Sequence, residues 1–299
     1  MLYKNILIIS DIEGSSGCWS YEASAFLTDE WFKACVDMSL DVDSVVKALF
    51  NAGVEQITVK DFHRTGYNLI PELIDNRVKI VHGYKEGPVP GIGDPYGAEA
   101  LMMIGMHASS GSGGFLAHTL TSRLAYLEVN GKAVSEAELF SSSLFSFGLV
   151  PVFFSGCPVA CSEAEKSIPG IGSYPAEKKN FETFDKEKWR KGLAASAVSA
   201  LNNKKTSPFL LKGPFKAAVK MRDGKDEARK LAQRWNFLFE EDKIFIETDT
   251  FDLLYYNLIR LCYLYPAAEK ILPVVLPVYN LYGRYGLYRL RKRIFNEKN

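Results

Sequence analysis

The stretch Asn5-Ile-Leu-Ile-Ile-Ser-Asp-Ile-Glu-Gly14 begins with a nearly continuous apolar run and ends with two carboxylates. A run such as that from Asn5 to Ser10 is typical of a strand buried on both faces of a parallel sheet. In open α/β sheets, ligands bind just beyond the carboxyl ends of the strands. Asp11 and Glu13 stand at that point, so one stretch predicts both the fold class and the edge of the sheet where a site would form.

Strand-like and helical segments alternate through most of the chain. Apolar residues at helical spacing predict a helix from about 30 to 52, and Gly53 is a stop signal. The pair Asn130-Gly131 predicts a two-residue hairpin between 126–129 and 132–134. Further strands are expected at 54–60, 78–82, 101–105 and 150–155, and another helix at 135–147. The alternation predicts an α/β fold with a mostly parallel sheet flanked by helices.

The regular alternation of strand-like and helical segments is interrupted after Ile168. The glycine- and proline-rich segment 169–172 and the charged segment 177–188 are interpreted as a linker with a solvated face. A helix at 189–201, a strand at 215–221 and a strand–helix pair at 243–264 predict a smaller C-terminal α/β subdomain. We therefore divide the chain into an α/β domain that holds the candidate site, a C-terminal subdomain, and a basic aromatic tail, at 1–170, 171–270 and 271–299.

Composition narrows the class of protein. Hydrophobic residues make up 47% of the 299 residues and charged residues 24%, which is enough for a sizeable core. The net charge of +1 argues against nucleic acid as a partner of the whole surface. The five cysteines are scattered and form no Cys-x-x-Cys pair, so we expect a reducing compartment. Neither a signal-peptide pattern nor a spanning apolar stretch is evident, and a cytoplasmic location is expected.

Three of the four histidines stand where a predicted strand gives way to a loop. They are His63, His107 and His118, and the carboxylates Asp11 and Glu13 have the same kind of position. Neutral imidazole together with carboxylate suits Zn²⁺, and Mn²⁺ and Co²⁺ also suit. The competing interpretation of His63 and His107 is a pair of core histidines satisfied by backbone. The carboxylates at a neighbouring strand end favour a hydrolytic metal site instead. The fourth histidine, His82, is not assigned to that site.

Five short motifs carry a resemblance to a known family. They are Ser10-Asp-Ile-Glu-Gly14, Lys60-Asp-Phe-His63, Gly105-Met-His-Ala108, Ala117-His-Thr119 and Val134-Ser-Glu136. In order and spacing they resemble the D-aminopeptidases of the DppA type, peptidase family M55. The resemblance extends from about Ile6 to Pro169 and is poor beyond that point.

The resemblance implies a metal-dependent aminopeptidase that hydrolyses short peptides, including ones with D-amino acids, and forms a ring-like homo-oligomer. It assigns two zinc ions per chain and the ligands Asp11, Glu13, His63, His107 and Glu136, with Asp11 as the bridging carboxylate. His118 corresponds to the catalytic histidine. Paired metals lower the pKa of water and polarise a peptide carbonyl, and an imidazole titrates near neutrality, so this division of roles agrees with the chemistry.

Several neighbouring residues have structural interpretations. Ser135-x-x-Glu138 is a capping-box pattern, so Glu138 is interpreted as structural. Asp61 either orients a ligand or forms a turn. The glycine-rich segment 109–114 before His118 is interpreted as a mobile loop that closes over substrate.

Two departures from the family concern the substrate side of the pocket. Cys157 stands where the family carries an acidic residue, and Ser173 to Lys178 replaces a lysine-containing segment. Metal binding is therefore better supported than D-peptide specificity. Two other functions stay open. One is a metal-binding interaction protein without catalysis. The other is a phosphoryl-transfer hydrolase of the haloacid dehalogenase kind using Asp11, although Glu13 and Ser15 fit its Asp-x-Asp-Gly-Thr motif poorly.

The C-terminal tail interleaves aromatic and basic residues. Between Leu281 and Asn299 six basic residues face one acidic residue, which gives a local net charge of +5. We favour an amphipathic helix that packs on a neighbouring subunit. Contact with a membrane surface is the less favoured interpretation.

Overall fold

The apolar run that follows Lys4 is the strand β1 (Asn5–Ser10) in the computed structural model, which describes residues 2–203 and 205–296. It lies inside a six-stranded parallel sheet with the order β3-β2-β1-β4-β7-β8. The other strands are β2 (Gln56–Asp61), β3 (Lys79–Val81), β4 (Ala100–Met106), β7 (Val150–Gly156) and β8 (Gly172–Pro175). From Ile6 onward β1 is buried, as expected for a strand covered on both faces.

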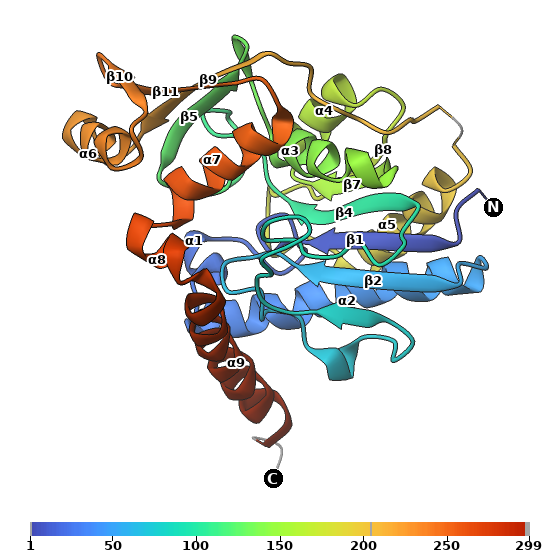
Figure 1. Cartoon of the computed structure of the whole chain (residues 1–299). Coiled ribbons are helices and arrows are strands. Elements are labelled where there is room, and N and C mark those ends of the chain that lie inside the picture. Colours follow the sequence, from blue (N-terminus) through green and yellow to red (C-terminus); the bar gives the residue numbers. More distant parts are fainter. Residues whose placement is uncertain (1, 204, 297–299) are drawn as a thin grey trace.

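Helices cover this sheet. The long helix α2 (Asp29–Asn51) and α5 (Lys186–Ala200) pack together behind it, as Figure 1 shows. Thr28 caps α2 by accepting a hydrogen bond from the Trp31 N–H at 3.0 Å, and acidic residues occupy its first turn. The remaining helices near the sheet are α1 (Tyr21–Ser24), α3 (Glu136–Ser143), α4 (Pro158–Ser167) and two short 3₁₀ turns, Pro71–Leu73 and Phe145–Phe147.

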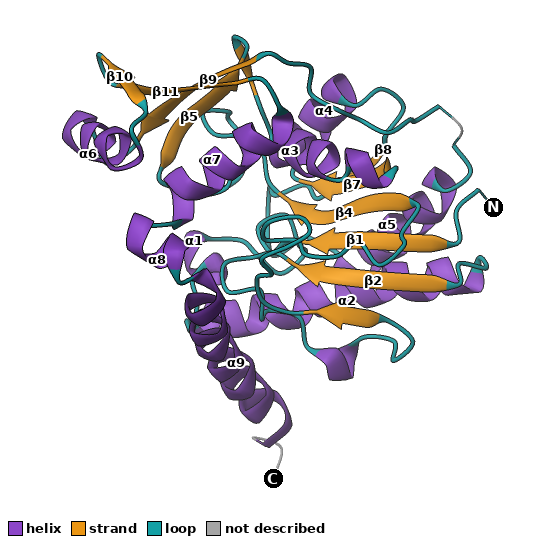
Figure 2. Cartoon of the chain, viewed as in Figure 1, coloured by secondary structure: helices purple, strands orange, loops and turns teal. Residues whose placement is uncertain are grey.

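A second sheet is antiparallel and has the order β10-β11-β9-β5-β6 (Figure 2). Its strands are β5 (Leu124–Val129), β6 (Lys132–Ala133), β9 (Phe215–Met221), β10 (Leu238–Glu240) and β11 (Lys243–Thr248), with α6 (Lys225–Trp235) and α7 (Phe251–Tyr263) packed against it. The predicted hairpin is confirmed: β5 and β6 pair across Asn130 and Gly131, which have φ of 53° and 76°. The predicted fold class, a mostly parallel α/β sheet flanked by helices with a smaller second unit, is confirmed.

The interpretation of 169–172 as a linker is wrong at its end, where Gly172 begins a strand. Gly172–Pro175 forms β8, whose Gly172 pairs with Phe153 at the edge of the parallel sheet. The glycines and prolines of this segment concealed a short edge strand. The antiparallel sheet also takes β5 and β6 from the N-terminal side of residue 170 and β9 to β11 from the C-terminal side. The boundary between the two sheets therefore does not fall at residue 170, and the division into domains stays a prediction.

The predicted tail forms the long helix α9 (Leu272–Asn296), which follows the short helix α8 (Pro266–Lys270) and packs on its own chain. The Asn280 side chain accepts a hydrogen bond from the Tyr84 N–H at 3.0 Å and donates one to the Tyr84 carbonyl at 3.1 Å. Residues 297–299 of the predicted tail lie outside the described residues. Within the part of the chain that the structure describes, no helix is both long and apolar enough to cross a membrane.

Candidate metal centre

The carboxyl ends of β1, β2 and β4 lie side by side and point towards α1, α7 and α8 (Figure 1). Asp11 and Glu13 follow β1, His63 follows β2 and His107 follows β4, so the parallel sheet brings these four residues to one edge. Gly14 allows the turn after β1 to close, because a Cβ there would lie 2.1 Å from the Met106 carbonyl oxygen. Its role is thus close packing of the strand ends.

The first group of donors consists of Asp11, Glu13 and His63, all buried. His63 Nε2 lies 2.8 Å from the Ser24 carbonyl oxygen, and a carbonyl only accepts, so Nε2 carries a proton and donates it. Nδ1 faces the carboxylates, 3.0 Å from Asp11 Oδ1 and 3.1 Å from Glu13 Oε2. The ring is therefore oriented by backbone, with the nitrogen that could bind a metal turned to the acidic side chains.

His107 repeats this arrangement on the other side of Asp11. Its Nδ1 lies 3.2 Å from the Ala108 carbonyl oxygen. Its Nε2 lies 3.3 Å from Asp11 Oδ2 and 3.5 Å from Glu136 Oε2. Asp11 consequently presents one oxygen to each histidine and stands between two groups of donors.

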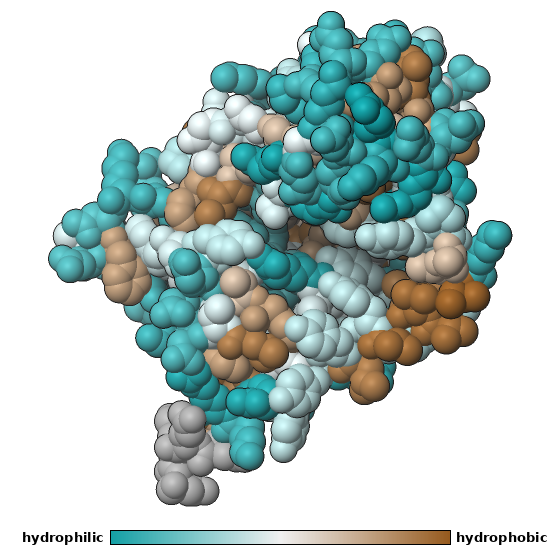
Figure 3. All heavy atoms as spheres, turned by 90° about the vertical axis from the view of Figure 1, so that its left-hand side faces the viewer, coloured by the Kyte–Doolittle hydropathy of each residue, from teal (hydrophilic) through white to brown (hydrophobic). Residues whose placement is uncertain are grey.

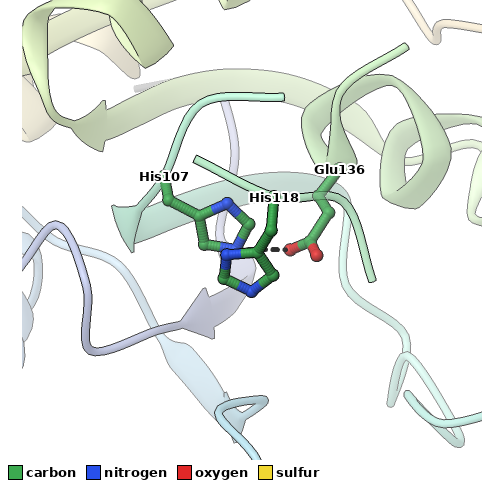
Figure 4. Close-up of side chains that lie close together, drawn as sticks. All are labelled: His107, His118 and Glu136. Atoms are coloured by element: carbon green, nitrogen blue, oxygen red, sulfur yellow. Dashed lines mark ion pairs between the residues drawn. The ribbon is translucent and has the colours of Figure 1, made fainter. Parts of the chain in front are cut away.

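The second group consists of His107, His118 and Glu136 (Figure 4). The rings of His107 and His118 stack with their centroids 3.6 Å apart. Glu136 begins α3, and its Oε1 accepts a hydrogen bond from the Leu120 N–H at 2.7 Å. His118 Nδ1 donates to the Leu116 carbonyl oxygen at 2.8 Å, which leaves Nε2 unprotonated and free to accept a proton or to bind an ion.

Electrostatics distinguish the members of the two groups. Burial would raise the pKa of Asp11, but hydrogen bonds from His107 and His63 hold it well below its usual value. Burial opposes protonation of His63, yet the adjacent Glu13 and Asp11 outweigh it and raise the pKa of His63 to about 10. Burial raises the pKa of Glu136 to about 7. Burial, with His107 adding to it, lowers the pKa of His118 to about 4, so this ring is neutral near pH 7.

The donor set fits divalent metal ions. Three carboxylates and two imidazoles are buried together, and removing charge from water is costly unless it is compensated. Among the described residues, no donor reaches Glu13 Oε2 with hydrogen-bond geometry, although His63 Nδ1 is only 3.1 Å away. An unpartnered buried carboxylate oxygen next to imidazole nitrogens is the environment that zinc would satisfy.

A cavity of about 1070 Å³ opens above the donors. Besides the donor residues it is lined by the loop before His118 and by residues of α7 and α9. Strand-end reasoning could not find the C-terminal part of this lining, because those residues lie on helices far away in the sequence.

Hydrogen bonds flank the glycine-rich segment 109–114 before His118, and the mobility of that segment stays a prediction. The Ser109 N–H and hydroxyl both donate to the Glu163 carboxylate at 2.8 Å. The His118 N–H donates to the Ala108 carbonyl oxygen at 3.0 Å. Hydrogen bonds thus hold both ends of the segment and position the His118 ring from the main chain.

The structure also decides the roles of several other residues. The Glu138 carboxylate accepts from the Ser135 N–H at 2.9 Å, so the predicted helix cap is present. Asp61 accepts from the backbone N–H of Leu69 at 2.8 Å and organises the loop after β2, which is the turn-forming alternative. His82 lies outside both donor groups, and its Nε2 is 3.1 Å from the Leu69 carbonyl oxygen. Cys157 is buried, as expected for a small packing residue.

Lys178, in a segment where a departure from the family was noted, occupies a buried position next to the loop after β1. Its Nζ donates to the carbonyl oxygens of Ser15 and Cys18, the latter at 2.8 Å. Burial lowers the pKa of Lys178 to about 8. This contact ties the segment after β8 to the turn that carries Asp11 and Glu13, and a single sequence contains no signal for it.

A parallel α/β sheet with paired groups of carboxylate and imidazole at its carboxyl edge defines a class of protein with a candidate two-ion metal centre. Comparison with known families then gives the particular family. A model of the peptidase family M55, described as D-aminopeptidase, matches residues 5–251, and the chain belongs to this family. The family suggested by the five sequence motifs is thereby confirmed, and the haloacid dehalogenase alternative is not supported.

Two individual proteins are similar to this chain. A D-aminopeptidase of Bacillus subtilis (strain 168) is 22% identical over 136 residues, which span 45% of this chain and 49% of the relative, about half its length. The solved structure of a Zn-dependent D-aminopeptidase, DppA from Bacillus subtilis, described as a self-compartmentalizing protease, aligns with a TM-score of 0.78. That alignment has 17% identity and covers 86% of this chain and 96% of the other, so it shows a shared fold.

Proposed function

We propose that this protein is a zinc-dependent aminopeptidase that hydrolyses short peptides, including peptides of D-amino acids. The observation that carries the proposal is the position of Asp11, which offers one oxygen to His63 and the other to His107 between two groups of donors. Membership of the D-aminopeptidase family and the fold shared with a Zn-dependent D-aminopeptidase support it.

In this proposal Asp11, Glu13, His63, His107 and Glu136 would hold the zinc ions, with Asp11 standing between the two groups of donors. Backbone carbonyls of Ser24 and Ala108 accept from the far nitrogens of the two imidazoles and orient the rings, so that their other nitrogens face the carboxylates. When bound, two zinc ions would polarise the peptide carbonyl and lower the pKa of the attacking water. Mn²⁺ and Co²⁺ suit the same donors.

His118 is proposed as the residue that transfers the proton. Its Nδ1 is committed to the Leu116 carbonyl oxygen, and its Nε2 is unprotonated because burial and His107 lower the pKa of the ring to about 4. A neutral imidazole at this place accepts a proton and delivers it to the leaving amine. The structure groups His118 with His107 and Glu136, so a ligand role is the alternative that experiment must separate.

The proposal is tested by metal content and by stereochemistry. Zinc-loaded protein should contain up to two ions per chain and should cleave D-alanyl-D-alanine faster than L-alanyl-L-alanine. Hydrolysis would be followed by release of free alanine, with chelator-treated protein as the control. Bound zinc without cleavage of either dipeptide would favour the metal-binding interaction protein, and a chain that binds no divalent ion would contradict the proposal.

We further propose that the protein forms a homo-oligomer in which the outward face of α9 contacts a neighbouring copy. The DppA structure is described as self-compartmentalizing. The exposed apolar residues of this face recur at alternating intervals of three and four, the spacing of a seam between two helices. They are Ile271, Val274, Val278, Leu281, Tyr285 and Tyr288.

Light scattering on the eluting protein tests the role of α9. Leu281→Asp should lower the mass of the assembly, because a charge in a helix seam is costly to bury. Leu238→Asp is the matched control, since Leu238 is also an exposed leucine but lies on β10. An unchanged mass for Leu281→Asp would assign the contact to another surface.

A further inference from the structure

The wall of the cavity opposite the metal donors comes from the C-terminal helices. Leu272, Val275, Leu276 and Tyr279 of α9 line the cavity, at the i, i+3, i+4 and i+7 spacing of one helix face. Ile259, on α7, continues the same lining. The family match ends at residue 251, so this wall is supplied by a part of the chain beyond it.

These wall residues are not part of the buried core. Leu272, Val275 and Leu276 are only half-buried, and the cavity space lies in front of them. On the side of the molecule drawn in Figure 3, the largest hydrophobic patch lies at the lower right. Apolar side chains that line a cavity and remain partly open to water gain free energy when an apolar ligand group covers them.

The rim of the cavity is cationic. Arg64, Lys85 and Arg222 line it and are exposed, against Glu86 as the acidic residue outside the donor set. In the described part of the chain, none of the three cations forms an ion pair with a carboxylate. Arg64 donates to the Tyr21 hydroxyl at 3.3 Å and Arg222 to the Ala117 carbonyl oxygen at 3.4 Å. Guanidinium and ammonium groups without acidic partners attract a carboxylate of the ligand.

The size of the cavity agrees with a substrate larger than dialanine. Its volume of about 1070 Å³ is at the upper end of the range of roughly 300–1,000 Å³ for small-molecule sites. A peptide of two small residues would leave the α9 wall uncovered.

From these three features we infer that the preferred substrates are short peptides with a large aliphatic or aromatic side chain and a free C-terminal carboxylate. The α7–α9 wall takes the side chain, and the cationic rim takes the carboxylate. This inference rests on the proposed function for the reaction itself. It adds the class of substrate and names the residues that select it.

The first experiment compares D-leucyl-D-leucine with D-alanyl-D-alanine on the zinc-loaded full-length protein. Burial of the larger side chains should make kcat/KM about 10-fold to 100-fold higher for the leucyl peptide. Val275→Asp should remove most of that preference, because a charge replaces part of the apolar wall that the larger side chain covers. Val275→Thr, which keeps the shape, should give a smaller loss in the same direction if the aspartate variant folds poorly.

Val159→Asp is the matched control, because Val159 is an exposed valine on α4 outside the cavity. It should keep the wild-type preference. Amidation of the leucyl peptide should reduce kcat/KM about 10-fold, and Arg222→Gln should diminish the difference between acid and amide. Equal rates for the leucyl and alanyl peptides, or a preference that survives Val275→Asp, would overturn the inference.

Calorimetric titration of the same dipeptides separates this inference from the proposed reaction. If the wild type cleaves neither dipeptide, the proposed function fails, and the binding constants still decide the inference. Binding of D-leucyl-D-leucine about 10-fold tighter than D-alanyl-D-alanine, lost in Val275→Asp, would support the wall as a selective surface. Equal binding would contradict it.

Discussion

Two clusters of charged residues include side chains of the loop after β1, and they differ in how their carboxylates are neutralised. In the first, Ser16 and Asp41 meet the Arg190 guanidinium, whose Nε lies 2.8 Å from Asp41 Oδ1. The same guanidinium lies 2.6 Å from Asp37 Oδ1. We call these four residues the Arg190 cluster. It contains a permanent cation, and Lys186 Nζ lies 2.7 Å from Asp37 Oδ2, so both carboxylates are paired with cations of the fold.

The donor cluster, defined as Asp11, Glu13, His63, His107, His118 and Glu136, contains only imidazoles as possible cations. Imidazole carries charge only when protonated, and Glu13 Oε2 has no hydrogen-bond partner among the described residues. Buried carboxylates without a permanent counter-ion invite a metal ion or a proton. Buried carboxylates alone therefore do not indicate a metal site. Buried carboxylates that lack an arginine or lysine partner do.

The largest expected effect comes from removing the imidazoles of the donor cluster. A His63→Ala, His107→Ala double variant should lose both zinc ions and at least about 10³-fold of its peptidase activity, because the metal chemistry goes with the ligands. Metal analysis and dipeptide hydrolysis measure this. His82→Ala is the control and should keep zinc and activity, since His82 lies outside the donor cluster. Zinc retained at two ions by the double variant would contradict the ligand assignment.

Next in size is the effect of His118. His118→Ala should lower kcat by about 10²-fold to 10⁴-fold while the zinc content stays unchanged, because proton transfer is lost and the ions remain. Stopped-flow hydrolysis and metal analysis on one preparation measure the two quantities together. Loss of one zinc ion along with activity would instead make His118 a ligand, in line with its place beside His107 and Glu136.

Breaking the Arg190 cluster should affect stability and leave metal binding intact. Arg190→Met leaves Asp41 buried without its cation, and we expect unfolding free energy to fall by about 3–5 kcal/mol. Denaturant unfolding of metal-free protein measures this. Arg77→Met, at an exposed pair with Asp75, should leave the unfolding midpoint nearly unchanged. A small effect of Arg190→Met would mean that the contrast between the clusters is wrong.

The stability and zinc affinity of the donor cluster should also depend on pH. The pKa of His63 is raised to about 10, so in metal-free protein it contributes stability that is fully present below pH ~6.5 and is lost as pH rises through about 10. Zinc must displace that proton, and its affinity should rise about 10-fold per pH unit for each proton released. Titration calorimetry at pH 8 in two buffers of different ionisation enthalpy would detect the proton. Identical heats in both buffers would contradict this protonation state.

The smallest effect contrasts two neighbouring glutamates of α3. Glu138→Ala removes the helix cap and should cost about 1 kcal/mol of unfolding free energy with no change in zinc content. Glu136→Gln should weaken zinc binding by about 10-fold or more, since it removes a charged donor beside His107. Thermal unfolding and zinc titration of both variants give the comparison. Equal zinc affinity in the two variants would remove Glu136 from the donor cluster.

Much of the fold and of the donor cluster could be predicted from the sequence, for a specific physical reason. A parallel sheet aligns the carboxyl ends of its strands, so residues that follow β1, β2 and β4 meet without any knowledge of the loops. The hairpin at Asn130-Gly131 was predictable because glycine and asparagine tolerate positive φ. The edge strand β8 escaped prediction because its residues show neither alternation nor a continuous apolar run.

The sequence alone shows which metal-donor residues are present and which strands they follow. The family motifs add Glu136 and His118 to them. Only the tertiary structure decided the rest. It placed Asp11 between two histidines, tied the rings to the carbonyls of Ser24 and Leu116, and brought α9 across the cavity. The reason is that strand ends follow from local periodicity, whereas these contacts depend on how remote loops and helices pack, which the pattern of a single chain does not encode.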